Sequence, residues 1–92
     1  MEPRLREIMN ILSEEAAEVI QAISKCHRFG LDNVKPGLSL TNKQHLEEEI
    51  GDLVAMIELL KLEGVITDYG IKLAMQRKFE KLMKWSTIYE RD

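Results

Sequence analysis

Apolar residues recur along the first part of the chain at steps of three, four or seven, the spacing that places side chains on one face of an α-helix. Proline suits a first helical turn, and glycine suits the position just after a helix. The pattern therefore predicts one helix from Pro3 to Phe29, about 40 Å long if it is continuous. Its apolar face is formed by Leu5, Ile8, Leu12, Val19 and Cys26, and is widened by Ile11, Ala22 and Ile23.

Residues 30–40 interrupt this pattern with glycine, proline, asparagine and aspartate, which favour turns, and therefore predict a loop. Thr41 followed by Gln44 matches a capping box, in which two side chains satisfy free N–H groups at a helix start. The second helix is predicted to run from there to about Leu62, and Gly64 closes it. Its apolar face consists of Leu46, Ile50, Leu53, Ile57 and Leu60.

A third helix is predicted to begin after Thr67 or Asp68, because either residue can cap it. Strand signals are weak, since no window alternates cleanly between apolar and polar residues. The expected fold is all-α: an antiparallel bundle of about three helices in a single domain over residues 1–92. A chain of 92 residues buries only a modest core, so we expect oligomerisation to complete it. The apolar face of the third helix consists of Ile71, Met75, Leu82, Trp85 and Tyr89.

Composition narrows the class of protein. The net charge of −3 argues against a nucleic-acid partner, but a phosphate substrate stays compatible if a metal ion supplies positive charge. Cys26 is the only cysteine, so no intrachain disulfide forms and a reducing cytosol fits. The apolar runs are too short to span a bilayer, and the N-terminus lacks the apolar core of a signal peptide. We therefore expect a cytoplasmic protein with no membrane and no nucleic-acid partner.

Four carboxylates occupy the apolar faces predicted for the first two helices. Glu15 stands between apolar positions of the first helix, and Glu18 follows one turn later; Glu49 and Asp52 repeat this arrangement on the second. Gathering unpaired carboxylates in an interior is unfavourable unless cations neutralise them. Neither apolar face contains a basic residue, and ligands made only of oxygen suit hard divalent ions. The sequence therefore predicts a site for a hard divalent ion such as Mg²⁺ or Mn²⁺.

Another interpretation is a solvated helix surface, because a single E-x-x-E pair usually faces water. The second pair on the second helix favours the metal site. Glu14, Glu47 and Glu48 flank the apolar faces and are expected to face water or to support the ligands. His27 and His45 are expected to be surface or capping residues and not catalytic bases.

These motifs resemble a known family. "EEAAE" at residues 14–18 followed by "EIGD" at residues 49–52 is similar to the E-E-x-x-E … E-x-x-D signature of the MazG-like all-α nucleoside triphosphate pyrophosphohydrolases. The resemblance covers most of the chain. It implies an enzyme that hydrolyses a (deoxy)nucleoside triphosphate to the monophosphate and pyrophosphate, by attack of water on the α-phosphorus. It also implies a homodimer or homotetramer. The catalytic and Mg²⁺-binding residues that it implies are Glu15, Glu18, Glu49 and Asp52.

The stretch "AISKCHRFGLDNVKPG" at residues 22–37 is similar to short MazG-like proteins of bacteriophages, which would place the protein in the host cytoplasm. A phage enzyme of this kind would adjust one nucleotide pool, with a purine dNTP such as dGTP as a candidate substrate. A housecleaning enzyme would instead remove aberrant nucleotides. The sequence leaves both roles open.

Basic residues of the third helix are candidates for contacts with the substrate phosphates. Lys78 lies three residues after Met75 and is expected to point inward with the apolar face. The alternative is an aliphatic stem that lies along the surface with its ammonium group in water. Arg77 and Lys81 are weaker candidates, and the basic residues of the first helix rank below them. Gln76 stands where the family commonly has asparagine, so no base or sugar contact is assigned there.

A competing hypothesis from another functional class is a non-catalytic helical dimerisation or regulatory module with the same fold. The unfavourable grouping of four carboxylates argues for the enzyme. Metal-dependent release of pyrophosphate would discriminate between the two.

Overall fold

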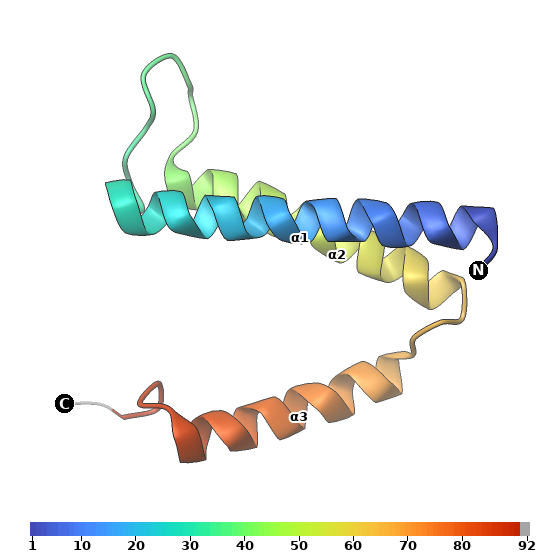
Figure 1. Cartoon of the computed structure of the whole chain (residues 1–92). Coiled ribbons are helices and arrows are strands. Elements are labelled where there is room, and N and C mark those ends of the chain that lie inside the picture. The colour runs from blue at the N-terminus through green and yellow to red at the C-terminus, as the bar shows by residue number, and fades with distance from the viewer. Residues whose placement is uncertain (91–92) are drawn as a thin grey trace.

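A computed structural model describes residues 1–90 of the chain. Three α-helices are present, and no strand is found among these residues apart from an isolated antiparallel bridge between Val34 and Thr41. The predicted all-α class is confirmed. So are the predicted extents of the first two helices and the predicted start of the third. The helices are α1 (Pro3–Phe29), α2 (Asn42–Leu62) and α3 (Asp68–Trp85), as Figure 1 shows.

Local chemistry explains where α1 begins and ends. The Glu2 carboxylate accepts a hydrogen bond of 3.2 Å from the backbone N–H of Arg4, one of the groups left without a partner at a helix start. Pro3 has no N–H to satisfy and occupies the first turn. At the other end, the Gly30 N–H donates to the Cys26 carbonyl at 2.9 Å. Gly30 has φ of 91°, a conformation that side chains disfavour, so the chain leaves the helix there.

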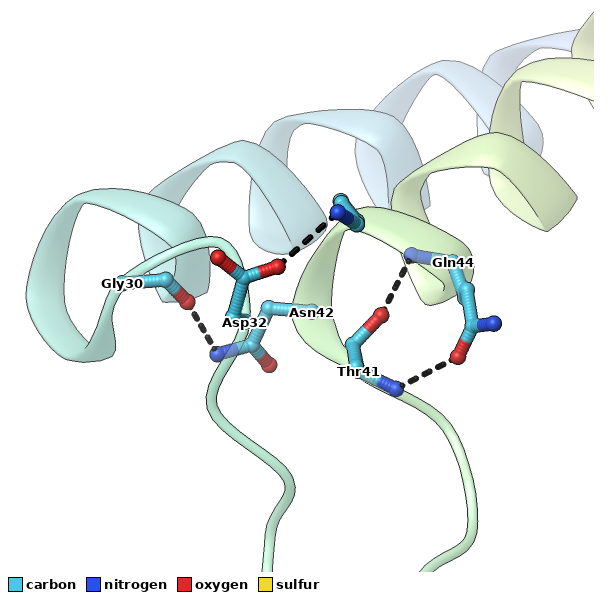
Figure 2. Close-up of polar contacts among 6 residues, drawn as sticks. Gly30, Asp32, Thr41, Asn42 and Gln44 are labelled. Carbon is cyan, nitrogen blue, oxygen red and sulfur yellow. Dashed lines mark hydrogen bonds and ion pairs between the residues drawn. The ribbon is translucent and has the colours of Figure 1, made fainter.

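The loop between α1 and α2 is tied at its base, as Figure 2 shows. The Thr41 hydroxyl accepts from the Gln44 N–H at 3.2 Å, and the Gln44 side chain accepts from the Thr41 N–H at 2.9 Å, which confirms the predicted capping box. The Asn42 amide donates to the Gly30 carbonyl at 2.9 Å and so joins the end of α1 to the start of α2. The two ends of the loop, at Gly30 and Asn42, are therefore held next to each other.

Helices α1 and α2 lie side by side and antiparallel, whereas α3 turns away from both (Figure 1). The hydrophobic residues fully buried among residues 1–90 are few: Ile8 and Ala22 of α1 and Leu60 of α2. All three belong to the apolar faces predicted for these helices. The interface of α1 with α2 is therefore the core of the single chain.

The turn from α2 into α3 is fixed by one lysine. The ammonium group of Lys61 lies 2.8 Å from Glu58 and 2.9 Å from Asp68, so it connects the last turn of α2 to the first turn of α3. Thr67 caps α3 by accepting from the Gly70 N–H at 3.0 Å. These contacts set the start of α3 but cover little of its surface.

The apolar face of α3 is uncovered. The chain measures 42 × 39 × 15 Å, and 15 Å is little more than the diameter of one helix with its side chains. A single layer of helices cannot enclose a third apolar face. The expectation that this face lies inward is therefore wrong for Met75 and Trp85, which are exposed in one chain, whereas Ile71 and Leu82 are half-buried. Tyr89 lies beyond the end of α3 and is exposed, as is Ile50 of α2.

None of the helices within residues 1–90 combines the length and the apolar composition needed to cross a membrane.

Candidate metal centre

Three carboxylates from two helices meet on the α1–α2 pair. Glu15, Glu49 and Asp52 each offer one oxygen, and these oxygens all lie within 4.8 Å of one another. Glu15 and Glu49 are half-buried, and Asp52 is exposed. Ligand oxygens sit about 2.1 Å from a Mg²⁺ ion, hence up to about 4.2 Å from one another. Small side-chain movements would therefore bring the three oxygens onto one ion.

Helical periodicity places these residues. Glu15 lies between the half-buried residues Leu12 and Val19 and so shares the face that α1 turns toward α2. Glu49 holds the equivalent position on α2, three residues after Leu46. Because α1 and α2 are antiparallel neighbours, the two carboxylates approach each other across the helix interface.

The electrostatics of the cluster are unfavourable in the absence of a cation. The pKa of Glu15 is raised above its ordinary value of 4.5, first by burial and then by the negative charges of Asp52, Glu49, Glu18 and Glu14. Each of these effects disfavours the ionised carboxylate. In the absence of a cation, the repulsion among these carboxylates therefore opposes ionisation of Glu15.

His45 is the one basic side chain that contacts the cluster among residues 1–90. Its Nε2 lies 3.1 Å from Oε1 of Glu49, one turn further along α2. The side chain of His45 is 32% exposed and that of Glu49 is 14% exposed. Sequence reasoning missed this contact, although the spacing of four residues on one helix was a usable signal.

The predicted fourth ligand, Glu18, does not join the cluster of three carboxylates. Glu18 is exposed and is not one of the three residues whose oxygens converge. Its charge nevertheless helps to raise the pKa of Glu15, so it contributes to the same field. Asp52 is also exposed, so each helix presents one half-buried and one exposed carboxylate.

The basic residues predicted to contact phosphate lie on α3, which turns away from the α1–α2 pair that carries the cluster (Figure 1). Arg77, Lys78 and Lys81 are all exposed on α3. In the single chain Lys78 does not point inward, because α3 makes few contacts with the other two helices. Its contact with phosphate stays a prediction.

The donor set fits a hard divalent cation. Within residues 1–90, neither Glu15 nor Asp52 forms an ion pair with a basic side chain. The available donors are carboxylate oxygens, which are the ligands preferred by Mg²⁺ and Mn²⁺. A bound cation would also remove the repulsion that raises the pKa of Glu15.

Comparison with known proteins agrees with the sequence motifs and with the helical fold. The family model of the MazG nucleotide pyrophosphohydrolase domain matches residues 4–84. Neither the search of curated proteins nor the search of solved structures found a matching protein. The matched region includes both acidic motifs and most of α3. The chain therefore belongs to the family of the MazG nucleotide pyrophosphohydrolase domain.

Proposed function

We propose that the chain hydrolyses a nucleoside or deoxynucleoside triphosphate to the monophosphate and pyrophosphate in a reaction that depends on Mg²⁺. The observation that carries the proposal is the convergence of Glu15, Glu49 and Asp52 from two helices of a nucleotide pyrophosphohydrolase domain. Carboxylates grouped against their own repulsion suit the binding of a cation and its phosphate ligand.

The residues proposed to hold the cation are Glu15, Glu18, Glu49 and Asp52. When bound, Mg²⁺, or Mn²⁺ in its place, supplies positive charge at the phosphates and lowers the pKa of a water molecule. The water oxygen forms a bond to the α-phosphorus, and the bond from that phosphorus to the bridging oxygen breaks. Pyrophosphate leaves with the electron pair, and the water proton passes to one of the carboxylates. No nucleophilic serine or cysteine is required, since phosphoryl transfer depends mainly on positioning and electrostatics.

We also propose that the active form is a homodimer or a homotetramer. Support comes from the exposed apolar residues of α3 and from the thickness of only 15 Å, which leaves that face without a partner in one chain. Symmetric association is the usual way to cover such a surface. Arg77, Lys78 and Lys81 lie on the same helix and are proposed to contact the substrate phosphates in the assembly.

The proposed place of action is the cytoplasm, or the host cytoplasm for a phage protein. A purine deoxynucleotide such as dGTP is the first substrate to test. The second candidate function is a non-catalytic helical dimerisation or regulatory module, and the observation that favours it is the uncovered apolar face of α3.

The experiment that tests the proposal is a substrate panel with product analysis. The purified protein is incubated with each standard and modified (d)NTP, with Mg²⁺ or with chelator, and the products are separated. The proposal expects the monophosphate and pyrophosphate in equal amounts, formed only with metal. Release of single phosphate from the γ-position would reject this reaction, and no turnover of any substrate would favour the dimerisation module.

A further inference from the structure

A hollow whose surface is mostly apolar but whose lining includes three basic residues, the cationic hollow, opens where the loop meets the ends of α1 and α2. It consists of two adjoining parts that share Lys25, Lys35 and Asn42. One part also includes His45, and the other also includes Arg28. Lys25 and Arg28 belong to the last turns of α1, whereas Lys35 comes from the loop. The hollow therefore brings together positive charges that are distant in the sequence.

The positive charge of this hollow is not neutralised by the chain. No acidic side chain lines either part, and among residues 1–90 none of Lys25, Arg28 and Lys35 forms an ion pair. The aspartate of the loop, Asp32, is instead paired with Lys43 at 2.9 Å. Three cations around one hollow in a chain of net charge −3 favour an anionic ligand.

The backbone around the hollow is held in place. Asn42 donates from its side chain to the Gly30 carbonyl at 2.9 Å and from its backbone to the Asn33 carbonyl at 3.0 Å. Within the loop, the Leu38 N–H donates to the Lys35 carbonyl at 3.0 Å. These bonds fix the position from which Lys35 extends relative to the end of α1.

The hollow also adjoins the carboxylate cluster. His45 lines the hollow, and its Nε2 lies 3.1 Å from Oε1 of Glu49. One helical turn, about 5.4 Å of rise, therefore separates His45 in the wall of the hollow from Glu49 in the candidate metal centre. Lys25 follows Glu18 by seven residues, about 10 Å of rise along α1, a gap that the distal phosphates and the extended lysine side chain would span together.

We propose that Lys25, Arg28 and Lys35 bind the distal phosphates of the substrate, the pair that leaves as pyrophosphate. This inference rests on the proposed function above. Ammonium and guanidinium groups form charge-assisted hydrogen bonds with phosphate oxygens. Negative charge builds on the leaving pyrophosphate as its bond to the α-phosphorus breaks, so fixed cations there stabilise the transition state. The assignment adds contacts from α1 and the loop to the phosphate contacts proposed for α3.

The test uses the full chain and inorganic pyrophosphate without metal, followed by amide chemical shifts in NMR. Pyrophosphate should perturb the amides of residues 25–42. The double variant Lys25→Gln with Lys35→Gln should weaken pyrophosphate binding by at least about tenfold, since each lost charge removes a strong contact. The control is Lys43→Gln, which removes one lysine charge beside the hollow; it should change binding by less than about twofold, because Lys43 is already paired with Asp32 and exposed ion pairs contribute little.

Kinetic measurements then test whether pyrophosphate occupies the same site as the distal phosphates of the triphosphate. Pyrophosphate should inhibit hydrolysis in competition with the triphosphate, and the double variant should raise KM, lower kcat and weaken that inhibition. Shifts confined to residues 77–81 of α3, unchanged binding in the double variant, or non-competitive inhibition would each overturn the inference. Two further results separate it from the proposed function. Normal pyrophosphate binding without any triphosphate hydrolysis supports the anion site and rejects the reaction. Normal hydrolysis that the double variant does not change supports the reaction and rejects the anion site.

Discussion

A carboxylate oxygen of Glu15 on α1 lies within 4.8 Å of a carboxylate oxygen of Glu49 on α2. The two residues come from opposite sides of the only extensive helix interface in residues 1–90. Like charges at this distance oppose the packing of α1 against α2. A divalent cation bound to both would convert the repulsion into attraction. Metal binding and helix packing are therefore linked at this site.

The first prediction follows from that linkage. Mg²⁺ or Mn²⁺ should raise the melting temperature, because a ligand of the folded state stabilises it by mass action. At a metal concentration about 100 times Kd the gain is about 2.7 kcal/mol, which for a domain of this size corresponds to roughly 10 to 20 °C. Calorimetry with millimolar Mg²⁺ and then with excess chelator measures it. A melting temperature unaffected by either addition would contradict a preformed site.

The second prediction concerns the protein without metal. Glu15 has no basic partner among residues 1–90, whereas Glu49 has His45. Glu15→Gln should therefore stabilise the metal-free protein at pH 7, because it removes repulsion and breaks no ion pair. The same change should abolish stabilisation by metal. Glu47→Gln, an exposed position on the same acidic stretch of α2, serves as the control and should alter neither property.

The third prediction concerns pH. The pKa of Glu15 is raised in the folded state, so above 4.5 the folded protein binds more protons than the unfolded chain. The contribution of Glu15 to the stability of the metal-free protein therefore falls as pH rises from 4.5 through the raised pKa. The advantage of Glu15→Gln over the unmodified protein should accordingly be absent near pH 4 and present at pH 7. Urea unfolding in chelator at both values tests this. An advantage that is the same at both values would show that Glu15 titrates normally.

The contribution of Asp68 to stability changes with pH in the opposite direction to that of Glu15. Its pKa is lowered, first by the hydrogen bond from Lys61 and then by the charge of that lysine. Its contribution is present above 3.8 and is lost as pH falls through the lowered pKa. The contribution of Asp68 is the same in Glu15→Gln and in the unmodified protein, so it cancels when the two are compared at each pH.

The fourth prediction concerns assembly. Trp85 is 76% exposed in the single chain, and a second copy that covers α3 should bury it. Light scattering at micromolar concentration should give the mass of a dimer or a tetramer. The emission of Trp85, the only tryptophan, should shift to longer wavelength on dilution as the oligomer dissociates. A monomer across this range would contradict the proposed assembly.

Much of the fold could be predicted because its boundaries are set by local chemistry. Pro3, Gly30 and the Thr41–Gln44 capping box act through neighbouring residues, so the sequence contains all the information that they need. The packing of α3 could not be predicted in the same way. Periodicity shows which face of a helix is apolar, but the surface that covers it depends on the whole assembly, so the apolar residue Met75 remains exposed in one chain.

The candidate site was predicted in part for a similar reason. Helical spacing identified Glu15 and Glu49 as residues on packed faces, and they do converge with Asp52. Spacing alone could not tell that Glu18 remains at the edge, because that depends on how the two helices cross. The cationic hollow was also missed. It joins Lys25 of α1 to Lys35 of the loop, and only the fixed loop conformation brings them together.

The most direct test of the central claim is hydrolysis in water enriched in ¹⁸O, with Mg²⁺ and the best substrate of the panel. The account predicts that the label enters the monophosphate and not pyrophosphate, because water attacks the α-phosphorus. Turnover should fall by orders of magnitude in Glu15→Gln and in Glu49→Gln, whose helices should persist by circular dichroism, while Glu47→Gln should retain it. Label found in pyrophosphate or single phosphate, or turnover that survives both Glu15→Gln and Glu49→Gln, would contradict the account.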